Sequence, residues 1–94
     1  MIISFGDKKT EDVFNEKKPP GLPADILKRA LMKLQQIHLS GNVNDLRIPP
    51  SNHLEKLEGD RIGQYSIRIN DQWRVCFVWD EDDNASRVEI IDYH

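Results

Sequence analysis

Cysteine, histidine and long apolar runs are scarce in this 94-residue sequence, and each scarcity excludes a class of protein. The single cysteine, Cys76, cannot form an internal disulfide, and with three histidines at unrelated spacing it offers no set of metal ligands. The longest apolar stretches are a few residues long, against about 20 for a membrane-spanning helix. The N-terminus carries neither a basic lead nor a cleavage site. These features predict a cytoplasmic protein without membrane association, metal or cofactor.

The net charge of −3 is unevenly distributed along the chain. Residues 1–75 carry twelve basic and ten acidic residues, whereas residues 76–94 carry one basic and six acidic residues. Much of the acid lies in the run Asp-Glu-Asp-Asp at 80–83, which separates two strand-like segments and therefore predicts a solvated hairpin loop. The overall charge argues against nucleic-acid binding, but its distribution leaves room for a basic groove elsewhere.

The first half of the sequence is typical of helices. Helix-forming residues run from Asp7 to Lys17 after a short apolar segment at 2–5 that predicts a first strand. A proline-rich break at 18–23 precedes a second predicted helix, Ala24 to His38, whose apolar residues recur at intervals of three and four. Residues 43–50 are expected to be irregular because Pro49 and Pro50 fit neither a helix nor a central strand.

The second half of the sequence alternates between apolar and polar residues. Four such runs, at 54–57, 65–69, 73–79 and 88–91, predict strands, and the turn residues between them predict an antiparallel meander. The length fits one domain over residues 1–94. We therefore expect an α+β fold in which two N-terminal helices pack on one face of a small antiparallel sheet.

Alternation also predicts which strand residues share a face. Ser66 and Arg68 should point away from the apolar side of their strand, and Arg74 should do the same on the next strand. Two interpretations remain open for the arginines. They are solvated strand residues, or their guanidinium groups converge on a phosphate and stabilise the charge that develops when a phosphodiester is cleaved.

The sequence ends on a carboxylate, a phenol and an imidazole, Asp92-Tyr93-His94. These groups suffice for metal-free RNA cleavage in which a ribose 2′-hydroxyl attacks its own phosphate, but a solvated polar tail is the alternative. Of the other polar candidates, His38 is expected to bind the last carbonyls of its helix, and Cys76 to be a small buried apolar residue.

The run from Leu57 to Phe77, closed by 88–94, resembles the HigB-like killer proteins of the RelE and ParE toxin superfamily. The resemblance spans essentially the whole chain and rests above all on Gly-Asp-Arg at 59–61, Asn-Asp-Gln-Trp-Arg at 70–74 and the terminal Asp-Tyr-His. It implies a RelE-like fold and a type II toxin that cleaves messenger RNA in the ribosomal A site, inhibiting translation. It also implies a HigA-type antitoxin with a helix-turn-helix, through which the toxin binds operator DNA indirectly.

Residue by residue, the resemblance assigns catalysis to Arg74 and to the terminal triplet. These four catalytic candidates are Arg74, Asp92, Tyr93 and His94. The RNA-binding candidates are Arg68, Arg61 and His53. Glu55 stands where some family members carry a catalytic histidine, and Glu58 where lysine is usual, so a weaker toxin is expected. His53 lies two residues before Glu55, a spacing that keeps the same strand face, and is a candidate substitute.

Two other functions fit parts of the sequence. One is a non-catalytic module that binds the antitoxin and tunes repression of the operon, which the acidic balance together with Glu55 and Glu58 favours. The other is inhibition of DNA gyrase, as in the ParE branch, although the terminal triplet fits the ribonuclease branch better. The sequence leaves open which terminal residue is the general base and which the general acid.

Overall fold

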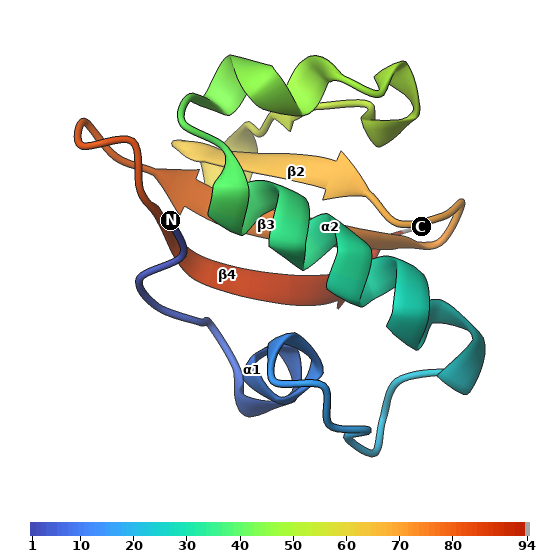
Figure 1. The fold of residues 1–94 in the computed structure, drawn as a ribbon. Helices are drawn as coiled ribbons and strands as arrows, with labels where there is room; N and C mark the ends of the chain where they lie inside the picture. The colour runs from blue at the N-terminus through green and yellow to red at the C-terminus, as the bar shows by residue number, and fades with distance from the viewer. Residues whose placement is uncertain (94) are drawn as a thin grey trace.

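A computed structural model describes residues 1–93, and Figure 1 shows two helices beside a four-stranded antiparallel sheet. The strands follow one another in sequence order, each hydrogen-bonded to the next. They are β1 Glu55–Lys56, β2 Gln64–Arg68, β3 Trp73–Trp79 and β4 Ala85–Asp92. The predicted α+β class and the meander are confirmed. Within this described part of the chain, no helix is long and apolar enough to cross a membrane.

The second predicted helix is α2, Leu27–Leu39, which follows a 3₁₀ turn, η1, at Ala24–Ile26. Figure 1 shows α2 lying across one face of the sheet, the inner face. The apolar stripe of α2 packs there against alternate strand residues in one buried cluster. This cluster includes Ala30, Leu34, Ile37, Ile67, Val75, Phe77 and Ile90. Each large apolar side chain buried there contributes about 1.5–3 kcal/mol to folding.

The first helix, α1, spans Lys8–Phe14 and packs against both α2 and β4. Its N-cap is Asp7, whose carboxylate accepts a hydrogen bond from the Thr10 backbone N–H at 2.8 Å. The helix ends three residues before the predicted Lys17. The reason is local, because Glu16 adopts a left-handed backbone with φ 63° and the following prolines exclude helical continuation.

The N-terminal segment covers the outer edge of β4. Isolated parallel bridges join Ile2 to Ala85 and Phe5 to Val88, where the sequence predicts a short strand. The Thr10 hydroxyl accepts a hydrogen bond from the Ile90 N–H at 2.8 Å in the same region. These contacts satisfy backbone groups that an open sheet edge would expose.

The structure corrects two expectations outside the strands. Residues 43–50 are not irregular, because a 3₁₀ helix, η2, occupies Val43–Arg47 behind a capping box, and a second one, η3, occupies Pro50–Asn52. The prediction for His38 is also wrong. Its Nδ1 accepts a hydrogen bond from the Ile2 N–H at 3.1 Å, so the ring ties the N-terminus to α2 instead of binding helix carbonyls.

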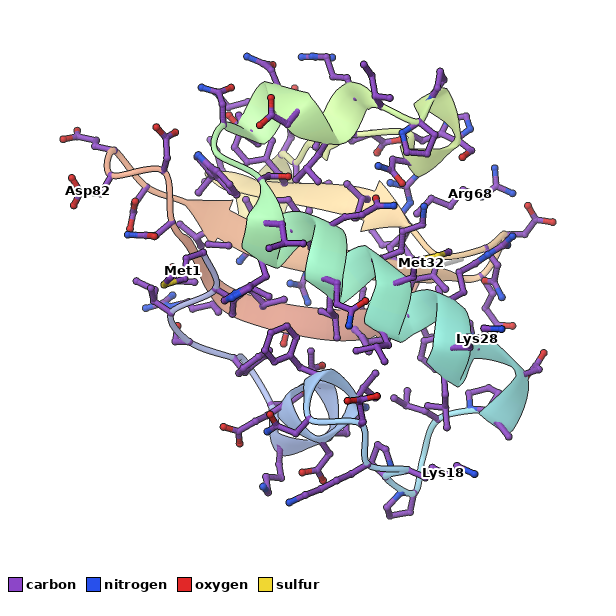
Figure 2. All side chains as sticks on the ribbon, viewed as in Figure 1. Met1, Lys18, Lys28, Met32, Arg68 and Asp82 are labelled. Carbon is purple, nitrogen blue, oxygen red and sulfur yellow. The ribbon has the colours of Figure 1, made fainter. Side chains whose placement is uncertain are left out.

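The acidic run at 80–83 forms the predicted hairpin loop between β3 and β4. One carboxylate oxygen of Asp80 accepts hydrogen bonds from the Asp82 and Asn84 N–H groups at 2.9 and 3.0 Å. Figure 2 places Asp82 and Arg68 at opposite ends of the sheet. The acidic loop therefore lies at the end of the sheet opposite the β2–β3 turn. The arginines of β2 and β3 lie next to that turn.

Candidate active site on the outer face of the sheet

The outer face is the side of the sheet turned away from α2. Its central row crosses all four strands, because the registers pair Glu55 with Ser66, Ser66 with Cys76, and Cys76 with Glu89. Ser66 and Cys76 are fully buried in the middle of this row, and a carboxylate lies at each end. Each of the two carboxylates binds an arginine.

Arg74 is fixed at the Glu55 end of the row. Its Nη1 donates to the Ser66 Oγ at 2.8 Å and to the His53 carbonyl at 3.2 Å, and its Nη2 lies 3.3 Å from a carboxylate oxygen of Glu55. The side chain is only 12% exposed. This arrangement confirms that Arg74 shares the polar face with Ser66, and it gives the guanidinium group one defined position.

Tyr93 lies against this guanidinium group. The Arg74 Cζ is 5.4 Å from the centre of the Tyr93 ring, within the range of a cation–π contact. The Tyr93 N–H donates to the Gln72 carbonyl at 2.6 Å, which fastens the end of the described chain to the start of β3. Tyr93 is 41% exposed, so part of its surface remains open to a planar ligand such as a nucleobase.

The other two members of the terminal triplet are placed differently. Asp92 is the last residue of β4, and its Cα partner on β3 is Trp73, a core residue of the inner face, whereas the ring of Tyr93 contacts Arg74. One carboxylate oxygen of Asp92 accepts a hydrogen bond from Gln72 Nε2 at 3.1 Å. His94 lies outside the described residues.

Arg61 occupies the Glu89 end of the row. It belongs to the 3₁₀ turn η4, Gly59–Arg61, and its Nη1 lies 2.7 Å from a Glu89 carboxylate oxygen and 3.1 Å from the Gln64 amide oxygen. The hydrogen bond with Glu89 raises the pKa of Arg61 above its ordinary value. A second guanidinium group is thus held over the outer face, from a loop distant in sequence from β4.

Cys76 lies beneath these charged groups. Burial raises the pKa of its thiol from 9.0 to about 11, while the positive charges of Arg61 and Arg74 oppose the shift and Glu89 adds to it. A thiol with this pKa stays protonated near neutral pH. The prediction that Cys76 is a small buried residue without a chemical role of its own agrees with this environment.

The remaining predicted RNA-binding residues do not join the Arg74 guanidinium. Arg68 is the Cα partner of Arg74, but its side chain forms an ion pair with Asp71 and lines a cavity next to α2. His53 contributes its carbonyl to Arg74 while its side chain is exposed. The expectation that His53 shares a strand face with Glu55 is wrong, because its left-handed backbone, φ 45°, precedes the strand.

The chain is similar to known toxins over nearly its whole length. Residues 3–94 match the family model described as the RelE-like toxin of type II toxin-antitoxin system HigB. The chain belongs to the HigB-like toxin family. Toxin HigB-1 of Vibrio cholerae serotype O1 is 39% identical over 80 residues, 84% of each chain. Endoribonuclease HigB of Proteus vulgaris is 32% identical over 94 residues, the full length of both chains.

Solved structures confirm the fold expected of a HigB-like toxin. A chain of the heterotetrameric YoeB-YefM toxin-antitoxin complex from Staphylococcus aureus matches with a TM-score of 0.59 and 21% identity, covering 100% of this chain and 98% of that one. A second YoeB-YefM complex from the same organism matches with a TM-score of 0.55 and 20% identity. At this identity the likeness concerns the fold alone.

Sequence reasoning about this HigB-like chain missed the residues that hold its arginines. Ser66 and Glu89 were visible only as polar positions in alternating strands, and nothing local links Glu89 to Arg61, 28 residues away. Glu55, noted as a departure from the family pattern, is the carboxylate that contacts Arg74. Among residues 1–93, no group of three or more His, Cys, Asp or Glu side chains is placed to hold a metal ion.

Proposed function

We propose that this HigB-like toxin is an endoribonuclease that cuts messenger RNA in the ribosomal A site and so inhibits translation. The observation that carries the proposal is the Arg74 guanidinium group, fixed by Ser66 and His53 beside the half-exposed ring of Tyr93. The full-length similarity to Endoribonuclease HigB of Proteus vulgaris supports the same activity.

The proposed reaction needs no metal ion. The ribose 2′-oxygen attacks the adjacent phosphorus and gives up its proton, the bond from phosphorus to the 5′-oxygen of the next nucleotide breaks, and that oxygen takes up a proton. The products are a 2′,3′-cyclic phosphate and a free 5′-hydroxyl. Arg74 stabilises the charge on the phosphoryl oxygens in the transition state, an effect for which one donor is worth about 10²–10³-fold in rate. We assign the two proton transfers to Asp92 and His94.

Tyr93 binds a nucleobase in this proposal. One face of its ring contacts Arg74, and the exposed part stacks on a base, a contact worth about 1–3 kcal/mol. Arg61, Arg68 and His53 are the further RNA-binding residues. Because Glu55 and Glu89 already pair with Arg74 and Arg61, RNA must compete with protein carboxylates, which is consistent with a weaker toxin.

The ribosome supplies the local concentration of RNA and the substrate geometry that the chain itself does not provide. With a net charge of −3, the protein has little general attraction for free RNA. A ribosome holds the message at high local concentration and presents the 2′-hydroxyl in a defined geometry, which removes much of the entropic barrier. The small number of binding groups on the chain therefore supports ribosome dependence.

We further propose that residues 1–94 form a single toxin domain that acts in the cytoplasm and is neutralised by a HigA-type antitoxin. The matched YoeB chains were solved together with YefM in toxin-antitoxin complexes, which supports an antitoxin partner here. A helix-turn-helix on that antitoxin would bring the toxin to operator DNA indirectly.

Primer extension on a reporter message in a reconstituted translation reaction tests the nuclease. We expect cuts at defined codon positions that require ribosomes, and a loss of about 10²–10³-fold in Arg74→Gln. Arg47→Gln is the matched control, since Arg47 is an exposed residue of η2 whose side chain, among the described residues, bonds only to Asn44. A folded, antitoxin-free protein that makes no cuts would leave the non-catalytic antitoxin-binding module as the function. Equal cutting of naked RNA would exclude ribosome dependence.

A further inference from the structure

A second cationic site lies on the α2 side of the sheet. A cavity of about 400 Å³ opens between α2, η3 and the β2–β3 turn. Arg29 and Lys33 line it from α2, and Arg68 and Asp71 line it from the sheet side. Figure 2 shows Met32 of α2 and Arg68 at this end of the molecule. The lining carries three cationic side chains and one carboxylate, so its net charge is positive.

Lys33 is the buried charge of this cavity. The residue is only 6% exposed, and its Nζ lies 2.5 Å from the amide oxygen of Asn52, a neutral partner. None of the ion pairs within residues 1–93 includes Lys33. Burial, and next the charge of Arg29, lower its pKa. A buried ammonium group without a carboxylate is costly, and an anion entering the cavity would offset that cost.

The position of Lys33 is firmly fixed. Asn52 is fully buried and donates to the Leu46 carbonyl at 3.1 Å and to the Gln36 side-chain oxygen at 3.2 Å, which leaves its own oxygen to face Lys33. The ammonium group therefore belongs to a network that connects α2 with η2 and η3. A ligand would meet a preorganised cation, which lowers the entropy lost on binding.

The two arginines at the rim are available to a ligand. Arg29 is exposed, and the one hydrogen bond of its side chain within residues 1–93 is a 3.3 Å contact with the Ile69 carbonyl. Arg68 pairs with Asp71, whose side chain is 95% exposed, and such surface pairs contribute only about 0–1 kcal/mol. A phosphate group could thus replace Asp71 at small cost, and guanidinium groups bind phosphate through paired, charge-assisted hydrogen bonds.

We propose that this cavity binds one phosphate group of an RNA strand, with Lys33, Arg29 and Arg68 as its ligands. The site lies next to the candidate active site, because Arg68 and Arg74 are cross-strand partners at the same end of the sheet. A strand whose scissile phosphate lies at Arg74 would pass the β2–β3 turn and place another of its phosphates in the cavity. The identity of the polyanion rests on the proposed function.

Fluorescence anisotropy with a labelled 2′-O-methyl octaribonucleotide at low salt tests the site. This probe lacks the attacking hydroxyl, so binding is measured separately from cleavage. We expect the Arg29→Gln, Arg68→Gln double variant to bind at least about ten times more weakly, and its slope of log affinity against log salt to fall by about 0.7. The matched control, Lys17→Gln with Lys28→Gln, removes the same charge around a different groove and should bind like the wild type.

Asp71→Asn provides a variant that should gain affinity, since it frees Arg68 while the fold keeps its buried contacts; we expect binding to strengthen about two- to fivefold. An equal loss in the double variant and in the lysine control would overturn the proposal in favour of diffuse attraction. The assignment to an RNA strand would be overturned if inorganic phosphate shifted the Lys33 and Asn52 NMR signals with the same affinity as the octamer. If the protein makes no cuts but octamer binding still depends on Arg29 and Arg68, the nuclease proposal is wrong and the phosphate site is still supported.

Discussion

Arg68 and Arg74 are direct cross-strand partners on β2 and β3, yet their guanidinium groups are held by different carboxylates. Arg68 pairs with Asp71 in the following turn, and Arg74 pairs with Glu55 on β1. Like charges placed opposite each other destabilise a sheet, and the two acids offset that repulsion. The sheet can therefore offer cationic groups both to the outer face and to the α2 side.

Replacing Glu55 should raise the activity of the toxin. Its carboxylate lies 3.3 Å from Arg74 and competes there with the phosphate of the substrate. We expect Glu55→Gln to cut ribosome-bound message about three- to tenfold faster, and Glu55→His to be faster still, because an imidazole can add general acid or base catalysis. Single-turnover cleavage on stalled ribosomes measures both rates.

Glu81→Gln is the control for this prediction, since Glu81 is exposed in the β3–β4 hairpin loop and forms none of the side-chain ion pairs seen within residues 1–93. Its cleavage rate should stay within about twofold of the wild type. A Glu55→Gln protein that is folded but slower than the wild type would contradict the competition model. It would instead identify the Glu55 carboxylate as a group that helps the reaction.

Truncating Tyr93 should weaken substrate binding more than removing its hydroxyl does. Tyr93→Phe keeps the ring that contacts Arg74 at 5.4 Å and should keep most of the activity, whereas Tyr93→Ala loses the stacking surface. A stacked base is worth about 1–3 kcal/mol, so kcat/KM should fall about 5- to 150-fold in the alanine variant. Equal losses in both variants would assign the effect to the hydroxyl instead of the ring.

The sequence was sufficient for the elements whose pattern is local. Strand β3 was predicted residue for residue at 73–79, because alternate apolar side chains there meet one core. Helix α2 followed from its apolar stripe in the same way. The outer-face location of Arg74 also came from alternation alone. In each case the regular spacing of the residues that face the core decides the conformation, and that spacing can be read from the sequence.

The parts that could not be predicted depend on contacts between distant residues or on single backbone angles. Arg61 reaches Glu89 across the sheet, a pairing that no spacing indicates. Asn52 is buried because it bonds to α2 and η2, although an asparagine after two prolines is typical of an exposed turn. His53 leaves the strand face through one left-handed residue, which breaks the alternation on which its prediction rested.

Stability should depend on Cys76 at alkaline pH. Burial raises the pKa of its thiol to about 11 from the ordinary 9.0, so the folded state holds this proton more tightly than the unfolded state does. The resulting stabilisation is complete below pH 9 and is lost as the pH rises through 11. The free energy of unfolding, measured by urea denaturation, should therefore fall over this interval.

Cys76→Ala supplies the comparison, because tyrosines and lysines also titrate in that range. The variant should be less stable at neutral pH, since it leaves a small cavity, but its loss of stability between pH 9 and 11 should be smaller than in the wild type. Parallel curves for the two proteins would show that the Cys76 thiol ionises alike in the folded and unfolded states.

The Thr10 hydroxyl should be needed to hold α1 on the edge of the sheet. It accepts the Ile90 N–H at 2.8 Å, and Thr10 is fully buried. Thr10→Val has nearly the same shape but leaves this N–H unbonded, which costs about 1–3 kcal/mol. Thermal unfolding should show the loss, at about 4–8 °C per kcal/mol for a chain of this size.

Thr10→Ser separates the hydrogen bond from packing, since serine keeps the hydroxyl and loses only the methyl group that threonine buries. Its stability should fall by about 0.8 kcal/mol, but the Ile90 amide should remain protected from hydrogen exchange. In Thr10→Val the same amide should exchange faster than its neighbours in β4. A valine variant that keeps both its stability and the protection of Ile90 would mean that another group satisfies this N–H, and that α1 is held to β4 by apolar contacts alone.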